Sequence, residues 1–162
     1  MSNIDENTIE KEEILQNEES LLAGLMEAAD FKNNEVQPIA IKRNGKRLFT
    51  FSVHGFSEDE AKEWRKRCTK KIPNPRGKSL PKIDGEVDYT KLRSLEIYYS
   101  TVDEDRANIW DNKKMQEALN VPNGITMIDV VLKPGEKEAI CEIIDQLTGF
   151  DADVTPEEYA KN

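Results

Sequence analysis

The clearest hydrophobic pattern in this chain consists of two short apolar runs, one of which alternates strictly with polar residues. Phe49, Phe51 and Val53 alternate with Thr50 and Ser52, which is the period of a half-buried strand. A second apolar run, centred on residues 39–41, comes shortly before it. The dipeptide at 44–45, Asn-Gly, separates the two runs and favours the positive φ angles of a type I′ turn. The pattern therefore predicts an antiparallel β-hairpin over residues 36–54.

A helix is predicted directly after this hairpin. Ser57 stands three residues before Glu60, which is the spacing of a capping box at a helix N-terminus. Acidic residues follow Ser57 and basic residues end the segment, which suits the helix dipole. We expect the hairpin to pack on this helix, with Phe49, Phe51, Val53 and Trp64 largely buried.

Stripes of helical spacing predict further helices on both sides of this region. Before the hairpin, the apolar face of residues 20–31 predicts a short amphipathic helix that either packs on the core or docks on a partner. After it, Asp88 is an expected N-cap, Pro134 an expected first-turn proline and Gly149 an expected C-terminal glycine. The apolar positions of these later helices are Leu92, Leu95, Tyr99, Val102, Met115, Ala118, Leu119, Ile125, Ile128, Val131, Leu132, Ile140, Ile143, Ile144 and Leu147.

These elements predict an α+β fold: a mostly helical single domain of about five to six helices with an N-terminal antiparallel β-hairpin. Residues 1–18 are expected to form a flexible acidic N-terminal arm, because they are polar and cannot bury much surface. Residues 19–150 form the domain, in which the stretch 72–87, rich in proline and glycine, is expected to be a loop. Residues 151–162 are expected to be a polar C-terminal tail.

Charge is distributed unevenly over the 162 residues. The net charge is −9, which argues against general binding to nucleic acid. Residues 42–82 nevertheless hold thirteen basic residues against four acidic ones, whereas residues 1–30 hold nine acidic residues and one basic residue. The basic segment 42–82 either binds the chain's own acidic ends or binds an acidic partner.

The candidate binding residues come from this basic stretch and from one large aromatic residue. Trp110 fits a core position, and it also fits a binding hot spot, since aromatic residues are enriched there. The partner-binding candidates are Arg65, Lys66, Lys70, Lys71, Arg76, Lys78 and Trp110.

No combination of residues points to catalysis. His54 is the sole histidine and has no orienting partner in the sequence. The acidic run 103–105 lacks the spacing of a calcium loop, and no glycine-rich nucleotide fingerprint is present. We therefore expect no catalytic residues, no metal and no cofactor, and a protein that is not an enzyme. Cys68 and Cys141 are isolated, so two reduced thiols are favoured, although a disulfide between them stays open. We expect neither a signal peptide nor a membrane segment.

Three segments together resemble a known family. They are LFTFSVHGFSEDEAKEWRKRCTK, LRSLEIYYSTVDEDRANIWDNKKMQEALNV and ITMIDVVLKPGEKEAICEIIDQLTGFD. The most specific part is Tyr99, Thr101-Val102, Asp105 and residues 109–113, followed by the turn and helix LKPGEKEAI. In these segments the chain resembles the XkdN-like tail assembly chaperones of contractile-tailed phages, prophages and phage-tail-like bacteriocins, over residues 20–151.

The resemblance implies a non-enzymatic chaperone that binds the tape-measure protein, keeps it soluble and helps recruit tail tube subunits. It implies action in the cytoplasm of the bacterial host and absence from the mature tail. The expected partners are the tape-measure protein and the tail tube protein, with a second copy of the chain as a further candidate. Neither nucleic acid nor a membrane is expected. Two alternatives stay open: a small nucleic-acid-binding regulator that uses segment 65–82, and a minor structural tail protein.

Overall fold

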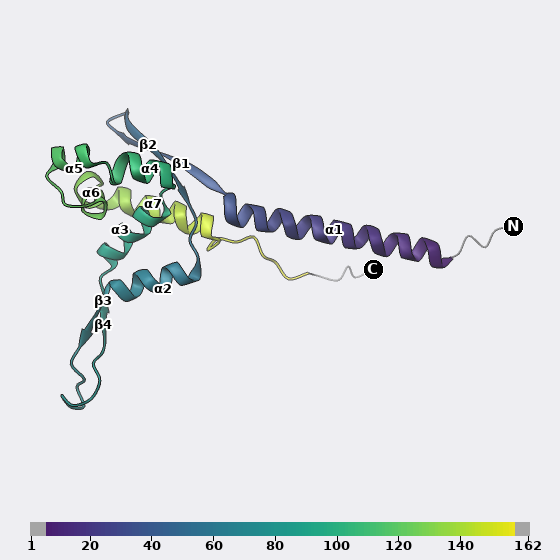
Figure 1. Ribbon diagram of the computed structural model, residues 1–162, viewed down its shortest axis with the longest axis horizontal. Coiled ribbons are helices and arrows are strands. Elements are labelled where there is room, and N and C mark those ends of the chain that lie inside the picture. Colours follow the sequence, from purple (N-terminus) through teal and green to yellow (C-terminus); the bar gives the residue numbers. More distant parts are fainter. Residues whose placement is uncertain (1–5, 158–162) are drawn as a thin grey trace. The chain divides into compact units, whose positions relative to one another are not determined.

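The computed structural model describes residues 6–157, and Figure 1 shows the order of its elements. The chain divides into two units, residues 1–35 and residues 36–162. The first contains α1 (Glu6–Asn34). The second contains β1 (Val36–Arg43), β2 (Lys46–His54), α2 (Glu58–Arg67), β3 (Thr69–Ile72), β4 (Ile83–Val87), α3 (Tyr89–Ser100), α4 (Asp103–Asp105), the π-helix η1 (Arg106–Trp110), α5 (Lys113–Leu119), α6 (Gly124–Val131) and α7 (Pro134–Thr148).

The predicted fold class is confirmed, since 58% of the structure is helical and its sheets are small and antiparallel. The position of the hairpin was wrong, because the long helix α1 precedes it. The predicted helix covered residues 20–31 and the flexible arm covered 1–18, whereas the described helix already begins at Glu6. Its first half lacks a continuous apolar stripe but is rich in glutamate, which has a high helix propensity. Residues 1–5 and 158–162 of the expected arm and tail lie outside the described residues.

The first hairpin forms as predicted. Strands β1 and β2 pair antiparallel from Val36 opposite His54 to Arg43 opposite Lys46. Asn44 and Gly45 have φ angles of 53° and 74°, as a type I′ turn requires. The capping box of α2 is also confirmed: the backbone N–H of Glu60 donates to Ser57 Oγ at 3.2 Å, and the Ser57 N–H donates to the Glu60 carboxylate at 3.3 Å.

The expected loop over residues 72–87 is a second hairpin instead. Strands β3 and β4 pair antiparallel, with Lys71 opposite Asp84 and Ile72 opposite Ile83. Gly85, which as a residue type indicates a loop, permits this pairing. A Cβ at position 85 would lie 2.9 Å from Ile72 Cγ2 and 3.0 Å from the Lys70 carbonyl oxygen. Only the connection between β3 and β4 remains irregular.

We expected the main core to lie between the first hairpin and α2, but this prediction was wrong. The hairpin packs mainly on α3 and α7, and the Phe51 ring meets the Trp110 ring edge to face at 5.5 Å. Trp64 of α2 belongs to a separate small cluster with Cys68 and Leu95. The expected burial is nevertheless confirmed for Phe51, Val53 and Trp64, while Phe49 is partly buried. Helix α2 packs instead on α3 and β3.

A buried lysine joins three helices of the core. The Lys137 ammonium of α7 donates to Ser94 Oγ of α3 at 2.6 Å and pairs with the Asp129 carboxylate of α6 at 2.8 Å. A buried ammonium is tolerated only where its donors are satisfied, as they are here. This contact was not predictable from local sequence patterns, because Ser94 lies 43 residues before Lys137.

Phe51→Ala should lower the free energy of unfolding by roughly 3–5 kcal/mol, because the ring is 1% exposed and its removal leaves a cavity beside Trp110. Denaturant unfolding would measure this loss. Thr50→Ala, at the exposed neighbouring position, is the matched control and should change the free energy by less than about 1 kcal/mol. Equal effects of the two substitutions would contradict the assigned inner face of β2.

Candidate functional site

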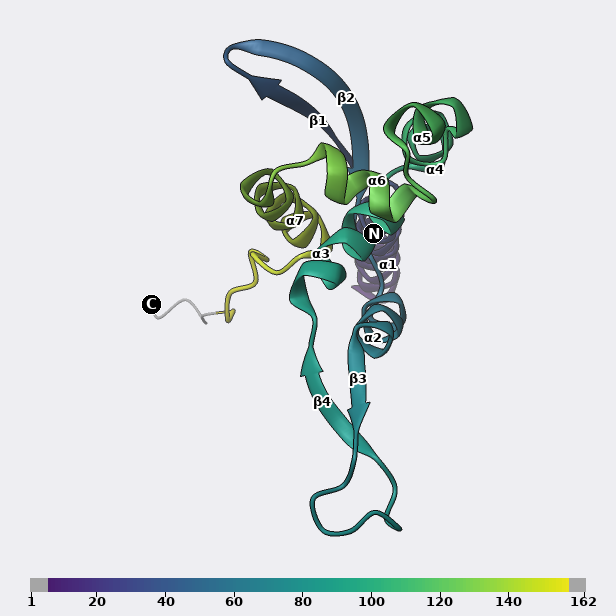
Figure 2. The ribbon, with the colours of Figure 1, turned by 90° about the vertical axis from the view of Figure 1, so that its left-hand side faces the viewer.

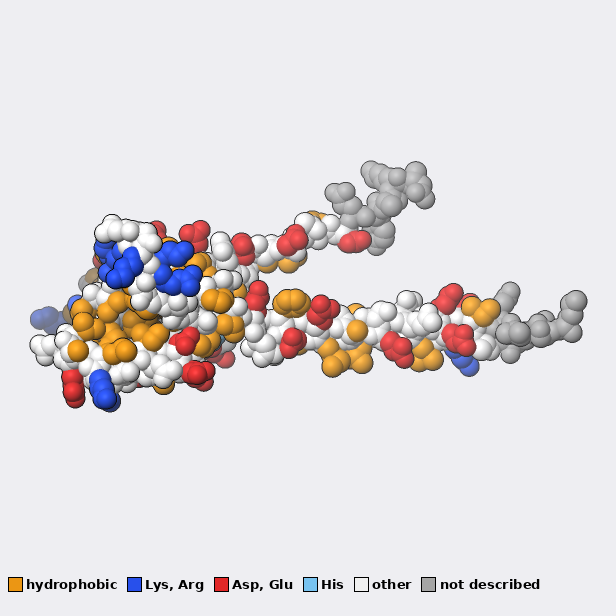
Figure 3. Space-filling model, turned by 90° about the horizontal axis from the view of Figure 1, so that it is seen from above, with side chains coloured by type: hydrophobic (Ala, Val, Ile, Leu, Met, Phe, Trp, Pro, Cys, Tyr) orange, Lys and Arg blue, Asp and Glu red, His pale blue; other side chains and the backbone are white. Residues whose placement is uncertain are grey.

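One hollow of the second unit is an apolar groove bordered by β2, η1, α5 and α6. Its volume is about 300 Å³. Figure 3 shows the hydrophobic side chains of this face gathered in one continuous patch. The lining residues are Phe49, Ile109, Trp110, Met115, Ala118, Leu119, Met127 and Val131. Met115 and Leu119 are 46% and 43% exposed, so this lining is open to a partner.

A π-helix shapes one wall of the groove. The Asp111 N–H donates to the carbonyl of Arg106 five residues back, at 2.8 Å. Such π-helical turns are frequent at functional sites. This turn places Ile109 and Trp110 in the wall, and Gln116 of α5 holds it by donating to the Trp110 carbonyl at 2.9 Å.

The start of α6 approaches this turn closely. A Cβ on Gly124 would lie 2.8 Å from Asp111 Oδ1 and 2.9 Å from the Trp110 carbonyl oxygen. Residue 124 must therefore be glycine for α6 and η1 to meet at this distance. The side chain of Asp111 is also fixed, since its carboxylate accepts from the Tyr98 hydroxyl at 2.8 Å. Close packing and hydrogen bonds thus join α3, η1, α5 and α6 around this wall of the groove.

Basic side chains flank the groove. Figure 3 shows Lys and Arg side chains gathered over the β1–β2 hairpin, beside the hydrophobic patch. Lys42, Lys46 and Arg47 at the tip of this hairpin are exposed. Arg43 fixes the hairpin in place, because its guanidinium contacts the Glu136 carboxylate at 2.6 Å and the Val131 carbonyl at 2.6 Å. The guanidinium holds the pKa of Glu136 below its usual value.

The basic candidates from the sequence lie on α2 and on the second hairpin. Arg65 and Lys66 are on α2, Lys70 and Lys71 are on β3, and Arg76 and Lys78 are in the β3–β4 connection; all are exposed. We call β3, β4 and their connection the basic arm. Figure 2 shows that the basic arm and the β1–β2 hairpin extend from opposite sides of the helices. Lys71 forms an ion pair with Asp84 across the arm.

Trp110 does not share this surface. Its side chain is fully buried, and its indole N–H donates to Thr101 Oγ1 at 3.0 Å. The core position therefore accounts for the burial of Trp110, whose ring also forms part of the groove wall. Sequence reasoning missed the groove itself. The i, i+3, i+4 spacing of Met115, Ala118 and Leu119 was the available signal, but it could not show that this face stays open.

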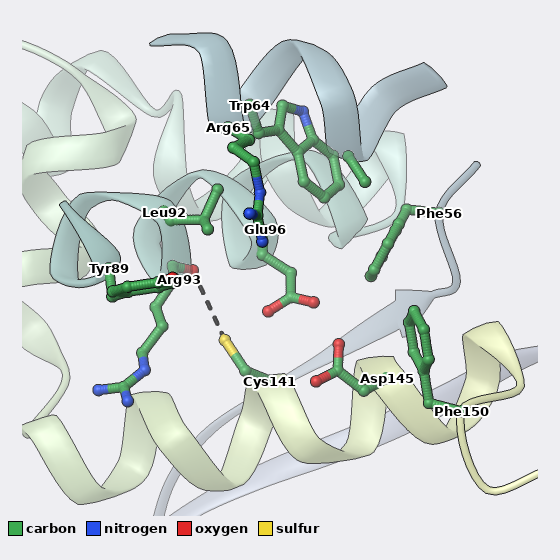
Figure 4. Close-up of a pocket in the computed structure, with 11 residues that line it drawn as sticks. Phe56, Trp64, Arg65, Tyr89, Leu92, Arg93, Glu96, Cys141, Asp145 and Phe150 are labelled. Atoms are coloured by element: carbon green, nitrogen blue, oxygen red, sulfur yellow. Dashed lines mark hydrogen bonds between the residues drawn. The ribbon is translucent and has the colours of Figure 1, made fainter. Parts of the chain in front are cut away.

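A second hollow, of about 340 Å³, lies between α2, α3 and α7 and has aromatic and acidic walls. Figure 4 shows the Glu96 and Asp145 carboxyl groups facing each other, with Trp64, Phe56 and Phe150 around them. Burial raises the pKa of Glu96 to about 8, and a hydrogen bond with Asp145 adds to the shift. Burial also raises the pKa of the nearby Cys141 thiol far above its usual value, so this cysteine is a poor nucleophile.

Within residues 6–157, no group of three or more His, Cys, Asp or Glu side chains is arranged to hold a metal ion. No helix among these residues is long and apolar enough to cross a bilayer. Cys68 and Cys141 are both buried and unbonded to each other.

An open apolar groove with a basic flank is the kind of surface that a protein-binding domain presents. Comparison with protein-family models identifies the domain. A model described as "Phage XkdN-like tail assembly chaperone protein, TAC" matches residues 22–161, and the chain belongs to this family. The resemblance noted from the sequence is thereby confirmed. Among curated proteins and among solved structures, the comparisons found no match.

Glu96→Gln should change how stability depends on pH. A carboxyl group whose pKa is raised on folding stabilises the folded state below its unfolded pKa, near 4.5, and this contribution is lost as pH rises toward 8. Wild type should therefore lose stability between these pH values relative to Glu96→Gln. Thermal unfolding at several pH values would measure the difference. Glu142→Gln, at an exposed position of α7, should leave the profile of wild type unchanged; identical profiles for both variants would contradict the raised pKa.

Proposed function

We propose that this chain binds the tape-measure protein of a phage tail, keeps it soluble and helps recruit tail tube subunits during assembly. It does so as a chaperone without catalysis, in the cytoplasm of the bacterial host, and leaves before the tail is mature. The observation that carries the proposal is the open apolar groove in a member of a tail assembly chaperone family.

The groove suits the chemistry of such a client. A tape-measure protein that has not yet been assembled is a long helical chain, and its apolar faces are exposed to aggregation. An amphipathic helix binds a groove by inserting apolar side chains spaced at i, i+3, i+4 and i+7. The groove offers a lining of aromatic, aliphatic and methionine side chains, and methionine adapts to varied surfaces. One site can therefore accept successive segments of a long client.

The basic arm supplies a second element of the proposed interaction. The arm projects from the helices (Figure 2), and its lysine and arginine side chains are exposed, so they can meet acidic residues of the client. Charges of this kind accelerate association and set orientation more than they add affinity. The groove is thus proposed to hold the client, while the arm guides it.

Leu119→Glu should sharply reduce the amount of tape-measure protein that stays soluble when the two proteins are expressed together. A carboxylate in the groove would have to be desolvated on binding, whereas in the free protein this partly exposed position tolerates it. The soluble fraction after centrifugation is the measurement. Val154→Glu, at a position that is 84% exposed and outside the groove, is the matched control. If Leu119→Glu and wild type keep equal amounts soluble, the groove is not the client site.

Reversing Lys70, Arg76 and Lys78 to glutamate should leave the melting temperature nearly unchanged, because exposed charges contribute little to stability. Association with the tape-measure protein should become slower, and its dependence on salt should weaken. Stopped-flow mixing at low and moderate salt would measure both. Reversal of Lys62 and Lys91, which are exposed on α2 and α3, is the control for a change of charge away from the arm. Early melting with unchanged association would mean that the arm stabilises the fold instead.

A further inference from the structure

Helix α1 carries large apolar side chains that its own unit cannot cover. The helix spans 29 residues and is the single element of the first unit that the structure describes. These side chains are 50–65% exposed. They are Ile9, Ile14, Leu15, Leu21, Leu22, Leu25, Met26 and Phe31. Helices in proteins owe most of their stability to packing of an apolar face, so α1 would gain stability from a partner surface.

The spacing of these residues fits a groove. Leu21, Leu22, Leu25 and Met26 recur at intervals of one, three and four residues and form two adjacent rows on the helix. Such rows are the anchors with which an amphipathic helix enters an apolar groove. The groove of the second unit has the matching chemistry, because its open surface is apolar throughout.

Charge selects between the possible partners of α1. The helix holds eight acidic and two basic residues between Glu6 and Asn34, so its net charge is 2 − 8 = −6. Two copies of α1 placed side by side would repel each other. The groove is instead flanked by the exposed cations Lys42, Lys46 and Arg47 on the hairpin, and α5 begins with Lys113 and Lys114. Electrostatic complementarity therefore pairs α1 with the groove and disfavours the pairing of α1 with α1.

We propose that, in the absence of a client, α1 of a second copy of this chain occupies the groove. Helix α1 thereby covers the apolar lining and buries its own apolar rows. The proposal rests on the proposed function in one respect: a client helix enters the same groove and must displace α1. A chaperone of this design keeps both of its apolar surfaces out of water until the client is present.

The test uses two variants of the full-length chain. The α1 variant carries Leu22→Glu and Leu25→Glu, so that its groove is intact and its helix cannot dock. The groove variant carries Met115→Glu and Leu119→Glu, so that its α1 is intact and its groove cannot accept it. All four positions are at least 43% exposed, and circular dichroism would verify that both variants stay folded.

Light scattering after gel filtration would give the mass of each sample. Wild type should have at least twice the monomer mass of 18.5 kDa, and each variant alone should have the monomer mass. An equal mixture of the two variants should regain a dimer of twice 18.5 kDa, because it contains one working α1 and one working groove. High salt should shift the mixture back toward monomer.

The outcomes that would overturn the proposal are equally specific. A monomeric wild type would exclude docking between copies. It would overturn the proposal even if α1 docked on the groove of its own chain. A mixture that stays monomeric would point to contacts between two α1 helices or between two grooves, and both would contradict the proposal.

Failure of this inference can be distinguished from failure of the proposed function. The α1 variant should still keep the tape-measure protein soluble, because its groove is intact, whereas the groove variant should not. If wild type is monomeric but the groove variant loses the client, the self-contact is wrong and the function stands. If the mixture dimerises but the groove variant still keeps the client soluble, the self-contact stands and the client site is wrong.

Discussion

The second unit depends on the junction where α3 ends against the first hairpin and the π-helix. The Thr101 hydroxyl is the centre of this junction: it donates to the Ile97 carbonyl at 2.6 Å and accepts from the Trp110 indole at 3.0 Å. The adjacent Val102 N–H donates to the Ser52 carbonyl at 2.9 Å, and the Ser52 N–H donates to the Asp105 carboxylate at 2.7 Å. Because Thr101 and Trp110 are fully buried, loss of either partner would leave a polar atom unsatisfied in the core.

Arg106 extends this junction to the groove. Its guanidinium donates to the carbonyl groups of Tyr98, Tyr99 and Thr101, all at 2.9 Å, and thereby satisfies the otherwise unpaired acceptors at the end of α3. The same residue begins η1, and its own carbonyl closes the π-helical turn. Arg106 therefore both caps the end of α3 and closes the turn that places Ile109 and Trp110 in the groove wall. The segment around residues 99–113, which carries the most specific part of the resemblance noted from the sequence, is therefore also the segment that forms this junction.

Local signals were predictable from the sequence, and contacts over long distances were not. Asn44-Gly45, the Ser57 cap and the Asp88 cap each depend on neighbouring residues alone, and each is found in the structure. The basic arm was missed because the pairing of β3 with β4 depends on how closely Gly85 can approach Ile72, which a residue type cannot reveal. The length of α1 was missed because helix propensity, and not an apolar stripe, extends it to Glu6. The groove could not be predicted from the sequence, because its walls come from residues spread over 49–131. Whether it stays open depends on whether another part of the fold covers it.

The opposite charges of α1 and the groove flank impose a limit on how tightly the self-contact can bind. If α1 of a second copy filled the groove in nearly all molecules, the apparent affinity for a client would fall in proportion to the fraction of grooves left open. The attraction between the acidic residues of α1 and Lys42, Lys46 and Arg47 does not make the self-contact this tight. These groups are exposed to solvent, so their attraction contributes little free energy. Much of the affinity must then come from a few apolar side chains of α1. A long client has an advantage over such a helix, because it brings many apolar segments to the same groove and raises their effective concentration. Weak, screened attraction between copies is therefore compatible with release on client binding, whereas a buried, highly complementary dimer would not be.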